Sequence, residues 1–198
     1  MNETTRKRNP DSVLNVLGKT VYLDDAPEAS TMLHAAIVVS PSAHGRFSGL
    51  DASAALAYAP DIHVLAAADV PGQNELSTSI PDEPMLATGE WHFKGEVLAL
   101  VLAPSRSQAR RAAALVKILG REDLPAIVDP REAFKAGKLI FGPRTMSAGD
   151  VDAALASCDV VVEGRVNSGG QEHVYLETQS AIAYPDDAGG VRVLSCTQ

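Results

Sequence analysis

Residues 94–119 contain the stretch that most constrains the fold. The run KGEVLALVLA (94–103) is mostly apolar and predicts a β-strand. Pro104 and Ser105 follow it and are typical of a helix start. Small apolar residues then recur at spacings of three and four, which predicts one stripe along a helix: Ala109, Ala112, Ala113 and Val116. We therefore expect this helix to pack closely on a sheet. Residues 115–119 are compatible with the end of the helix or with a further strand.

The segments before this unit alternate in the same way. Residues 32–40 and 62–70 predict strands, and the first is apolar enough to be covered on both faces. Asp51 is a good N-cap for a short helix over 52–59. Residues 71–92 have no periodicity, which predicts a long loop that is functional or packed against another body. This order describes one α/β unit that ends near residue 124.

The last third of the sequence predicts a linker and then the opening of another domain. The linker contains prolines, a short helix and a glycine turn. Asp150 then caps a short helix, and a strand beginning at residue 159 is expected to run into a pair of glycines. A last strand over 189–198 has no turn or cap after it, so we expect a domain whose remainder is absent.

The charge balance argues against a nucleic-acid partner. The 198 residues carry 17 basic against 25 acidic side chains, a net charge of -8, whereas nucleic-acid binding depends on neutralising phosphates. The basic cluster at residues 6–8 lies in a polar leader. Cys158 and Cys196 form no metal or disulfide motif and predict buried free thiols in a reducing compartment. No apolar run reaches the roughly 18 residues of a membrane span, so we expect a cytoplasmic protein with no membrane partner.

The polar cluster SGGQEHVYLETQSAIAYPDD (168–187) holds the residues best suited to chemistry. His173 and Glu177 would share a face of a helix, a spacing that suits a metal ion, but no third ligand is evident. Glu172 and Glu177 suit acid and base chemistry if both face one cavity. Gly170 and the glycine before it allow either a plain turn or a close approach of the backbone to a ligand. The residue types alone leave these interpretations open.

Several segments, in the same order, resemble one enzyme family. GGQEHVYLETQSAIAYP (169–185) is similar to the stretch Gly-Gln-Glu/Asp-His-Phe-Tyr-Leu-Glu-Thr that opens the molybdenum-binding region of xanthine dehydrogenases and aldehyde oxidases, with Val174 in place of the usual Phe. Five other segments resemble parts of the family's hammerhead domain and of the region that follows it: GKTVYLDDAP (18–27), AADVPGQNE (67–75), SQARRAAALVKI (107–118), EDLPAIVDPREAF (122–134) and GDVDAALASCDVVVEGRV (149–166).

The resemblance implies a molybdenum hydroxylase. In that family a molybdopterin-bound molybdenum centre hydroxylates a carbon of a purine or an aldehyde with oxygen from water, and iron-sulfur clusters and FAD on other subunits carry the electrons away. Matched residue by residue, Gln171 would donate its amide N–H to an oxo ligand of the molybdenum, beside Gly170. Gln171 is thus the metal-facing residue, and both residues would bind the cofactor. His173, Tyr175 and Glu177 match supporting positions.

The resemblance also sets the expected organisation. We expect an α/β (α+β) fold with a flexible leader (1–15), an α/β hammerhead domain (16–125), a linker (126–148) and the truncated start of a molybdopterin-binding domain (149–198). The short leader favours an enzyme whose iron-sulfur and FAD parts are separate partner subunits. The family's catalytic residues, its general-base glutamate included, have no counterpart before Gln198. We therefore expect the isolated chain to bind no cofactor and to be inactive.

Two further functions stay open. One is a non-catalytic module that docks onto subunits of an oxidoreductase through residues 71–92. The other is a metal-dependent hydrolase that uses Glu172, His173 and Glu177. Between a purine and an aldehyde as substrate, the closeness of the motif favours xanthine.

Overall fold

The computed structural model describes residues 10–77 and 80–197, which belong to two compact units. Of the described residues, those between 30 and 146 form one unit, and residues 10–29 together with 147–197 form the other. The basic cluster at 6–8 lies outside the described residues, as do residues 78 and 79 of the expected loop and residue 198 of the last expected strand.

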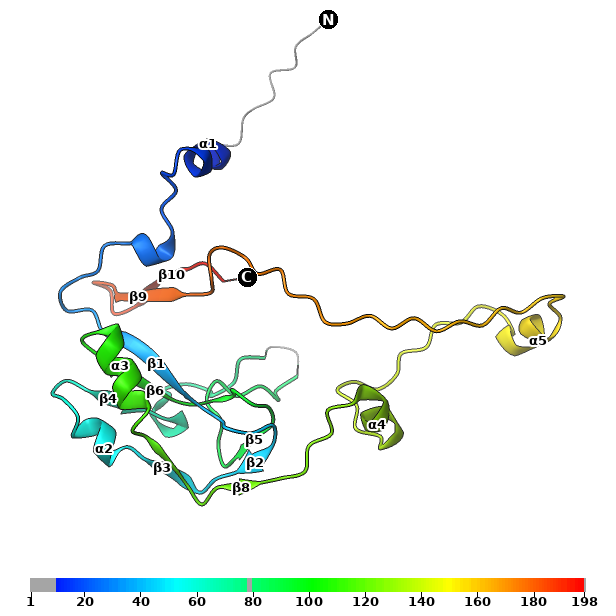
Figure 1. Cartoon of the computed structure of the whole chain (residues 1–198), viewed down its shortest axis with the longest axis horizontal. Helices are drawn as coiled ribbons and strands as arrows, with labels where there is room; N and C mark the ends of the chain where they lie inside the picture. The colour runs from blue at the N-terminus through cyan, green and yellow to red at the C-terminus, as the bar shows by residue number, and fades with distance from the viewer. Residues whose placement is uncertain (1–9, 78–79, 198) are drawn as a thin grey trace, which may run out of the picture. The chain divides into compact units, whose positions relative to one another are not determined.

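Both units are built from short elements (Figure 1). The unit of residues 30–146 contains β1 (His34–Val39), β2 (Gly45–Arg46), β3 (Gly49–Asp51), α2 (Ser53–Leu56), β4 (His63–Leu65), the 3₁₀ turn η2 (Ala67–Asp69), β5 (Glu90–Trp91), β6 (Val97–Ala103), α3 (Arg106–Ala113), β7 (Lys117–Leu119), β8 (Glu122–Asp123) and α4 (Pro130–Lys135). The other unit contains α1 (Pro10–Val16), the 3₁₀ turn η1 (Leu23–Asp25), α5 (Val151–Ala156), β9 (Ala181–Pro185) and β10 (Val191–Ser195).

The strand β6 is the centre of the larger unit. It pairs antiparallel with β1 on one side and with β4 on the other, so that Val101 lies opposite both Ala36 and Val64. The helix α3 packs across β1 and β6 (Figure 1). Ala109 and Ala112 of α3 are fully buried, as is Val101. The predicted alanine stripe is therefore confirmed, and its small side chains let the helix approach the sheet closely.

The single tryptophan, Trp91, lies in a second three-stranded sheet. Its strand order is β5-β2-β8, and Gly45 of β2 lies opposite Trp91 of β5 and Asp123 of β8. Trp91 is fully buried, with its ring centroid 5.8 Å from that of Phe47. A Cβ atom at Gly45 would lie 2.7 Å from both Trp91 Cε2 and the Glu122 carbonyl oxygen, well inside contact distance. Glycine at position 45 therefore allows the indole to pack directly against the backbone of β2.

Two buried polar side chains hold the turn that leads into β6. The Ser40 hydroxyl donates to the Phe93 carbonyl oxygen at 2.6 Å and accepts the amides of Gly95 and Glu96 at 2.9 and 3.1 Å. The Glu96 carboxylate accepts the amide N–H of His92. Ser40 and Glu96 are 1% and 5% exposed, and these bonds compensate for their removal from water.

The smaller unit contains a hairpin and a long irregular segment. β9 and β10 pair antiparallel, and the Asp186 carboxylate accepts the amides of Ala188 and Gly190 in the turn between them. No helix or strand forms between residues 157 and 180, and almost every residue there is exposed.

The expected fold class is confirmed, with an antiparallel rather than parallel arrangement of all described strand pairs. The predicted helix starts at Ser105 and Asp150 are also confirmed, because each side chain accepts a hydrogen bond from the amide three residues on. Residues 117–119 form a strand, which settles the open boundary after α3. Among the described residues, no helix combines the length and apolarity needed to cross a membrane.

Five local predictions are wrong. Asp51 is not the N-cap of α2, because the N-cap is Ala52 and the Asp51 carboxylate accepts the Ser53 amide at 3.0 Å. β1 is not covered on both faces, because alternate residues such as Ile37, at 55% exposed, face outward. The predicted strand 62–70 stops at residue 65 and turns into η2. No strand forms from residue 159 to the glycine pair, where Val160 and Val162 are 76% and 87% exposed. Cys158 is exposed rather than buried, although neither cysteine is in a disulfide.

Candidate functional site

The two residues expected to bind a cofactor lie on the irregular segment that precedes β9. Gln171 is exposed, and its side-chain Nε2 lies 3.3 Å from His173 Nδ1. Gly170 is also exposed, and a Cβ atom added there would meet nothing within 4 Å. The structure therefore brings Gln171 and His173 together and leaves the backbone at Gly170 open to a ligand.

The loop bends sharply just after these residues. Val174 has a φ of 52°, in the left-handed region that β-branched residues rarely adopt. The Glu172 carboxylate accepts the Val174 amide at 3.3 Å across this bend. Glu172 therefore holds the local backbone, and Tyr175 beyond the bend is 49% exposed.

The second carboxylate of the motif has a different partner. Glu177 is half-buried, and its Oε1 accepts the amide N–H of Leu23 at 2.9 Å. The two glutamates thus differ in their hydrogen-bond partners, since Glu172 bonds within the loop and Glu177 bonds to η1. No group of three or more His, Cys, Asp or Glu side chains that could hold a metal ion is found in the described part of the chain. The interpretation of Glu172, His173 and Glu177 as a direct metal site therefore has no support.

A cluster of charged side chains in the larger unit was not predicted from the sequence. His44 Nδ1 lies 2.9 Å from the Pro125 carbonyl oxygen, and its Nε2 lies 2.8 Å from Glu90 Oε1. Arg46 donates to the other Glu90 oxygen at 3.0 Å. The His92 ring stacks on His44 with centroids 6.0 Å apart and an interplanar angle of 22°. Glu90 comes near His44 only through the pairing of β2 with β5, and no local sequence signal marks that contact.

The geometry fixes the charge of His44. Its two partners, the Pro125 carbonyl and the Glu90 carboxylate, are both acceptors, so both bonds form only when both ring nitrogens carry a proton. The Pro125 carbonyl and then Glu90 raise the pKa of His44 above 6.5. In return, hydrogen bonds from His44 and Arg46 lower the pKa of Glu90 from 4.5 to about 2. The side chains of His44, Arg46 and Glu90 and the Pro125 carbonyl, together called the clasp below, join β2 and β5 to the start of the segment leading to α4.

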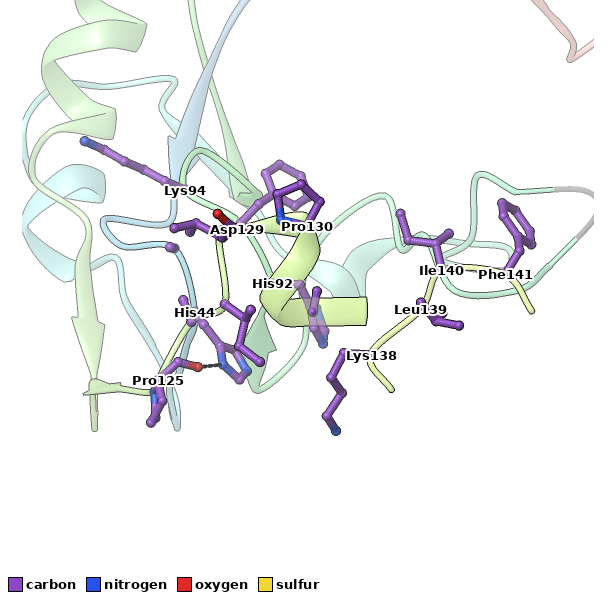
Figure 2. A pocket seen from close by; sticks show the side chains of 16 residues that line it. His44, His92, Lys94, Pro125, Asp129, Pro130, Lys138, Leu139, Ile140 and Phe141 are labelled. Atoms are coloured by element: carbon purple, nitrogen blue, oxygen red, sulfur yellow. Dashed lines mark hydrogen bonds between the residues drawn. The ribbon is translucent and has the colours of Figure 1, made fainter. Parts of the chain in front are cut away.

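An open cavity of about 860 Å³ lies beside this clasp and α4 (Figure 2). His44 and His92 are among the residues that line it, and Figure 2 shows the hydrogen bond between His44 and Pro125. Much of the remaining lining is apolar, and Ile140 and Phe141 are 86% and 60% exposed. Such a largely apolar lining is typical of a contact surface.

Comparison with known proteins decides the family. The family profile described as the aldehyde oxidase and xanthine dehydrogenase a/b hammerhead domain matches residues 17–123, more than half of the chain. The profile of the molybdopterin cofactor-binding domain matches residues 134–198. The chain belongs to the aldehyde oxidase and xanthine dehydrogenase family. The expected resemblance is therefore confirmed, and so is a hammerhead domain followed by part of a molybdopterin-binding domain.

Relatives in this family share moderate identity over nearly the whole chain. The xanthine dehydrogenase of Oryza sativa subsp. japonica is 39% identical over 94% of this chain and 14% of its own length. Aldehyde oxidase 1 of Bos taurus is 35% identical over 87% of this chain and 13% of its own. The solved aldehyde oxidoreductase of Desulfovibrio gigas superposes with a TM-score of 0.80 at 31% identity, over 94% of this chain and 23% of the other. The chain therefore spans about one seventh of the length of these curated relatives.

The chemistry of the loop fits the molybdopterin cofactor of this family. Gln171 offers a neutral amide N–H to an oxygen acceptor, and such a donor holds the oxygen without transferring a proton to it. Gly170 leaves room for close approach of a ligand to the backbone.

Proposed function

We propose that this chain forms one wall of the molybdenum-cofactor site of a xanthine dehydrogenase-like hydroxylase. The observation that carries the proposal is Gln171, an exposed neutral donor that stands within the match to the molybdopterin cofactor-binding domain. When bound, the cofactor would supply the redox chemistry that hydroxylates a substrate carbon. Gln171 would donate its side-chain N–H to a cofactor oxygen, and Gly170 would let the backbone approach it. A purine is the favoured substrate class.

His173 and Glu172 act as supports in this proposal. His173 Nδ1 lies within 3.3 Å of the Gln171 amide nitrogen, so its ring can orient that side chain. Glu172 holds the bend at Val174 through the amide of that residue. Neither side chain is assigned a proton transfer.

The isolated 198-residue chain is proposed to be catalytically silent. Every residue from 159 to 176 is exposed, so the described part of this chain does not shield a reacting centre from water. Iron-sulfur and flavin subunits are proposed as the partners that accept the electrons. Loading the purified chain with molybdenum cofactor and adding hypoxanthine should give no oxidation, and turnover would contradict this part of the proposal.

The test of the main proposal compares two glutamines in the assembled, molybdenum-loaded enzyme. Gln171→Ala should lower molybdenum content or hypoxanthine oxidation by about 10- to 100-fold, the usual effect of losing a side chain that holds a metal group through its ligands. Gln179→Ala is the matched control, because Gln179 is exposed and bonds only to Thr197 among the contacts described. Equal behaviour of the two variants would refute the role of Gln171.

A non-catalytic docking function is a second candidate. The apolar cavity beside α4, with exposed Ile140 and Phe141, favours it. Stable association of the chain with iron-sulfur and flavin subunits in the absence of molybdenum would support docking alone. Loss of that association on Phe141→Ser, with molybdenum binding intact, would assign the two functions to separate surfaces.

A further inference from the structure

Glu177 differs from the rest of its segment in its exposure to solvent. Between residues 134 and 179 every residue is exposed except Glu177, which is half-buried. The same segment leaves apolar side chains in water, with Val162 and Leu176 at 87% and 83% exposed. A carboxylate is the least favourable group to shield from water unless a donor compensates it. The shielding of Glu177 therefore reflects a specific contact.

That contact is with the N-terminal part of the same unit. Glu177 Oε1 accepts the amide N–H of Leu23, the first residue of η1, at 2.9 Å. The first amides of a helical turn have no acceptor within the turn, so an outside carboxylate completes it. Asp25 accepts the preceding amide, that of Tyr22, at 3.0 Å. Two carboxylates thus cap adjacent amides, one from inside the turn and one from 154 residues away.

The chain just after Glu177 is fixed as well. Cys196 Sγ donates to the Thr178 carbonyl at 3.0 Å, and the Cys196 amide donates to the Ser180 carbonyl at 3.3 Å. These bonds continue the hairpin of β9 and β10 up to Thr178. Gln171 is six residues before Glu177, a reach of at most about 20 Å of extended chain. Going back along the chain from the hairpin to Gln171, Glu177 is therefore the last residue that a long-range hydrogen bond holds in place.

We propose that Glu177 is a positioning residue that anchors the Gln171 loop to η1 by accepting the Leu23 amide. The inference rests on the proposed function, because it deepens the role of the Gln171 loop. It also gives the N-terminal segment that contains η1 a structural role in holding the loop. Leu23 falls within the hammerhead match that starts at residue 17, yet it folds with the unit that carries the cofactor loop. The N-terminal segment is then part of the support of the site.

The test needs no cofactor and uses the full 198-residue chain. Amide exchange of Leu23 and ¹⁵N relaxation of residues 171–176 are measured by NMR in the unaltered chain and in Glu177→Ala, Glu177→Gln and Glu172→Ala. Glu177→Ala should speed Leu23 exchange about tenfold and increase the mobility of 171–176. Glu177→Gln keeps an oxygen acceptor and should restore both. Glu172→Ala should leave Leu23 exchange unchanged, because Glu172 bonds to Val174 instead.

Two outcomes would overturn the inference. One is Leu23 exchange in Glu177→Ala as slow as in the unaltered chain, and the other is Glu177→Gln behaving like Glu177→Ala. Unchanged amide shifts at Ile182 and Leu194, which pair in the hairpin of the same unit, show that each variant is folded. The proposed function fails by a different result, namely Gln171→Ala retaining molybdenum and activity, so the two failures are distinguishable.

Discussion

Replacing Gly45 by alanine should destabilise the larger unit by about 3 kcal/mol, at the upper end of the usual overpacking range. The added Cβ would lie 2.7 Å from Trp91 Cε2 and from the Glu122 carbonyl, about 0.7 Å short of the 3.4 Å at which ordinary contact begins. Trp91 is fully buried and donates its indole N–H to Ser42 at 3.3 Å, so the ring has no free space to move into. The Glu122 carbonyl belongs to the backbone of β8. Relief of the clash must therefore disturb the pairing of β2 with β5 or β8.

The assay is thermal unfolding followed by the fluorescence of Trp91, which is the only tryptophan in the chain. A loss of about 3 kcal/mol corresponds to a fall in Tm of more than about 10 °C for a domain of this size. Gly49→Ala is the matched control, because Gly49 lies in neighbouring β3 and a Cβ there meets nothing within 4 Å. That variant should be unchanged or up to about 1 kcal/mol more stable, since alanine restricts the unfolded chain. Equal losses in both variants would refute the reasoning, as would a Gly45→Ala chain with an unchanged Tm.

Three further predictions concern the larger unit and the absence of a direct metal site. The stability contributed by His44 should be complete below pH 6.5 and should decline as the pH rises through its elevated pKa. The stability contributed by Glu90 should be complete above pH 4.5 and should decline as the pH falls toward its pKa of about 2. Thermal unfolding measured across the pH range should show both losses of Tm, the one at high pH and the one at low pH. Glu90→Gln should reduce the loss of Tm at low pH, and an unchanged loss would contradict the clasp. Ser105→Ala should lower the free energy of unfolding by about 1 kcal/mol through loss of the α3 cap, measured by urea titration, and an unchanged free energy of unfolding would contradict the role of that cap. Zinc at micromolar concentration should leave the Tm unchanged, and a rise of several degrees would point to a ligand cluster that the described residues do not show.

Local sequence rules predicted the helix starts and the core strand, and they failed where side chains compete with the backbone. Ser105 and Asp150 were predictable because each cap satisfies amides a few residues away. The predicted strand over 62–70 ends early because the Asp69 carboxylate accepts the Ala66 amide at 2.8 Å and closes a 3₁₀ turn. An Asp three residues after the start of the turn is the local sequence signal of this turn, and Asp25 repeats it at Tyr22.

The remaining differences come from long-range contacts that no local pattern records. The run that includes Val160 and Val162 has high strand propensity, but strands form only against a neighbouring strand. The bond between Glu177 and Leu23 spans 154 residues, and that between His44 and Glu90 spans 46. The motif around Gln171 was recognisable from the sequence. The structure adds that Glu172 and Glu177 have separate hydrogen-bond partners, Val174 and Leu23, which the residue types alone did not indicate.

The central claim is that the Gln171 side-chain amide contacts the molybdenum cofactor. The most direct measurement is electron–nuclear double resonance on the molybdenum-loaded enzyme, reduced to its paramagnetic state, with the glutamine side-chain amides labelled with ¹⁵N. The account predicts a ¹⁵N coupling that persists in Gln179→Ala and disappears in Gln171→Ala. A coupling that survives in Gln171→Ala, or that is absent from the unaltered enzyme, would contradict it.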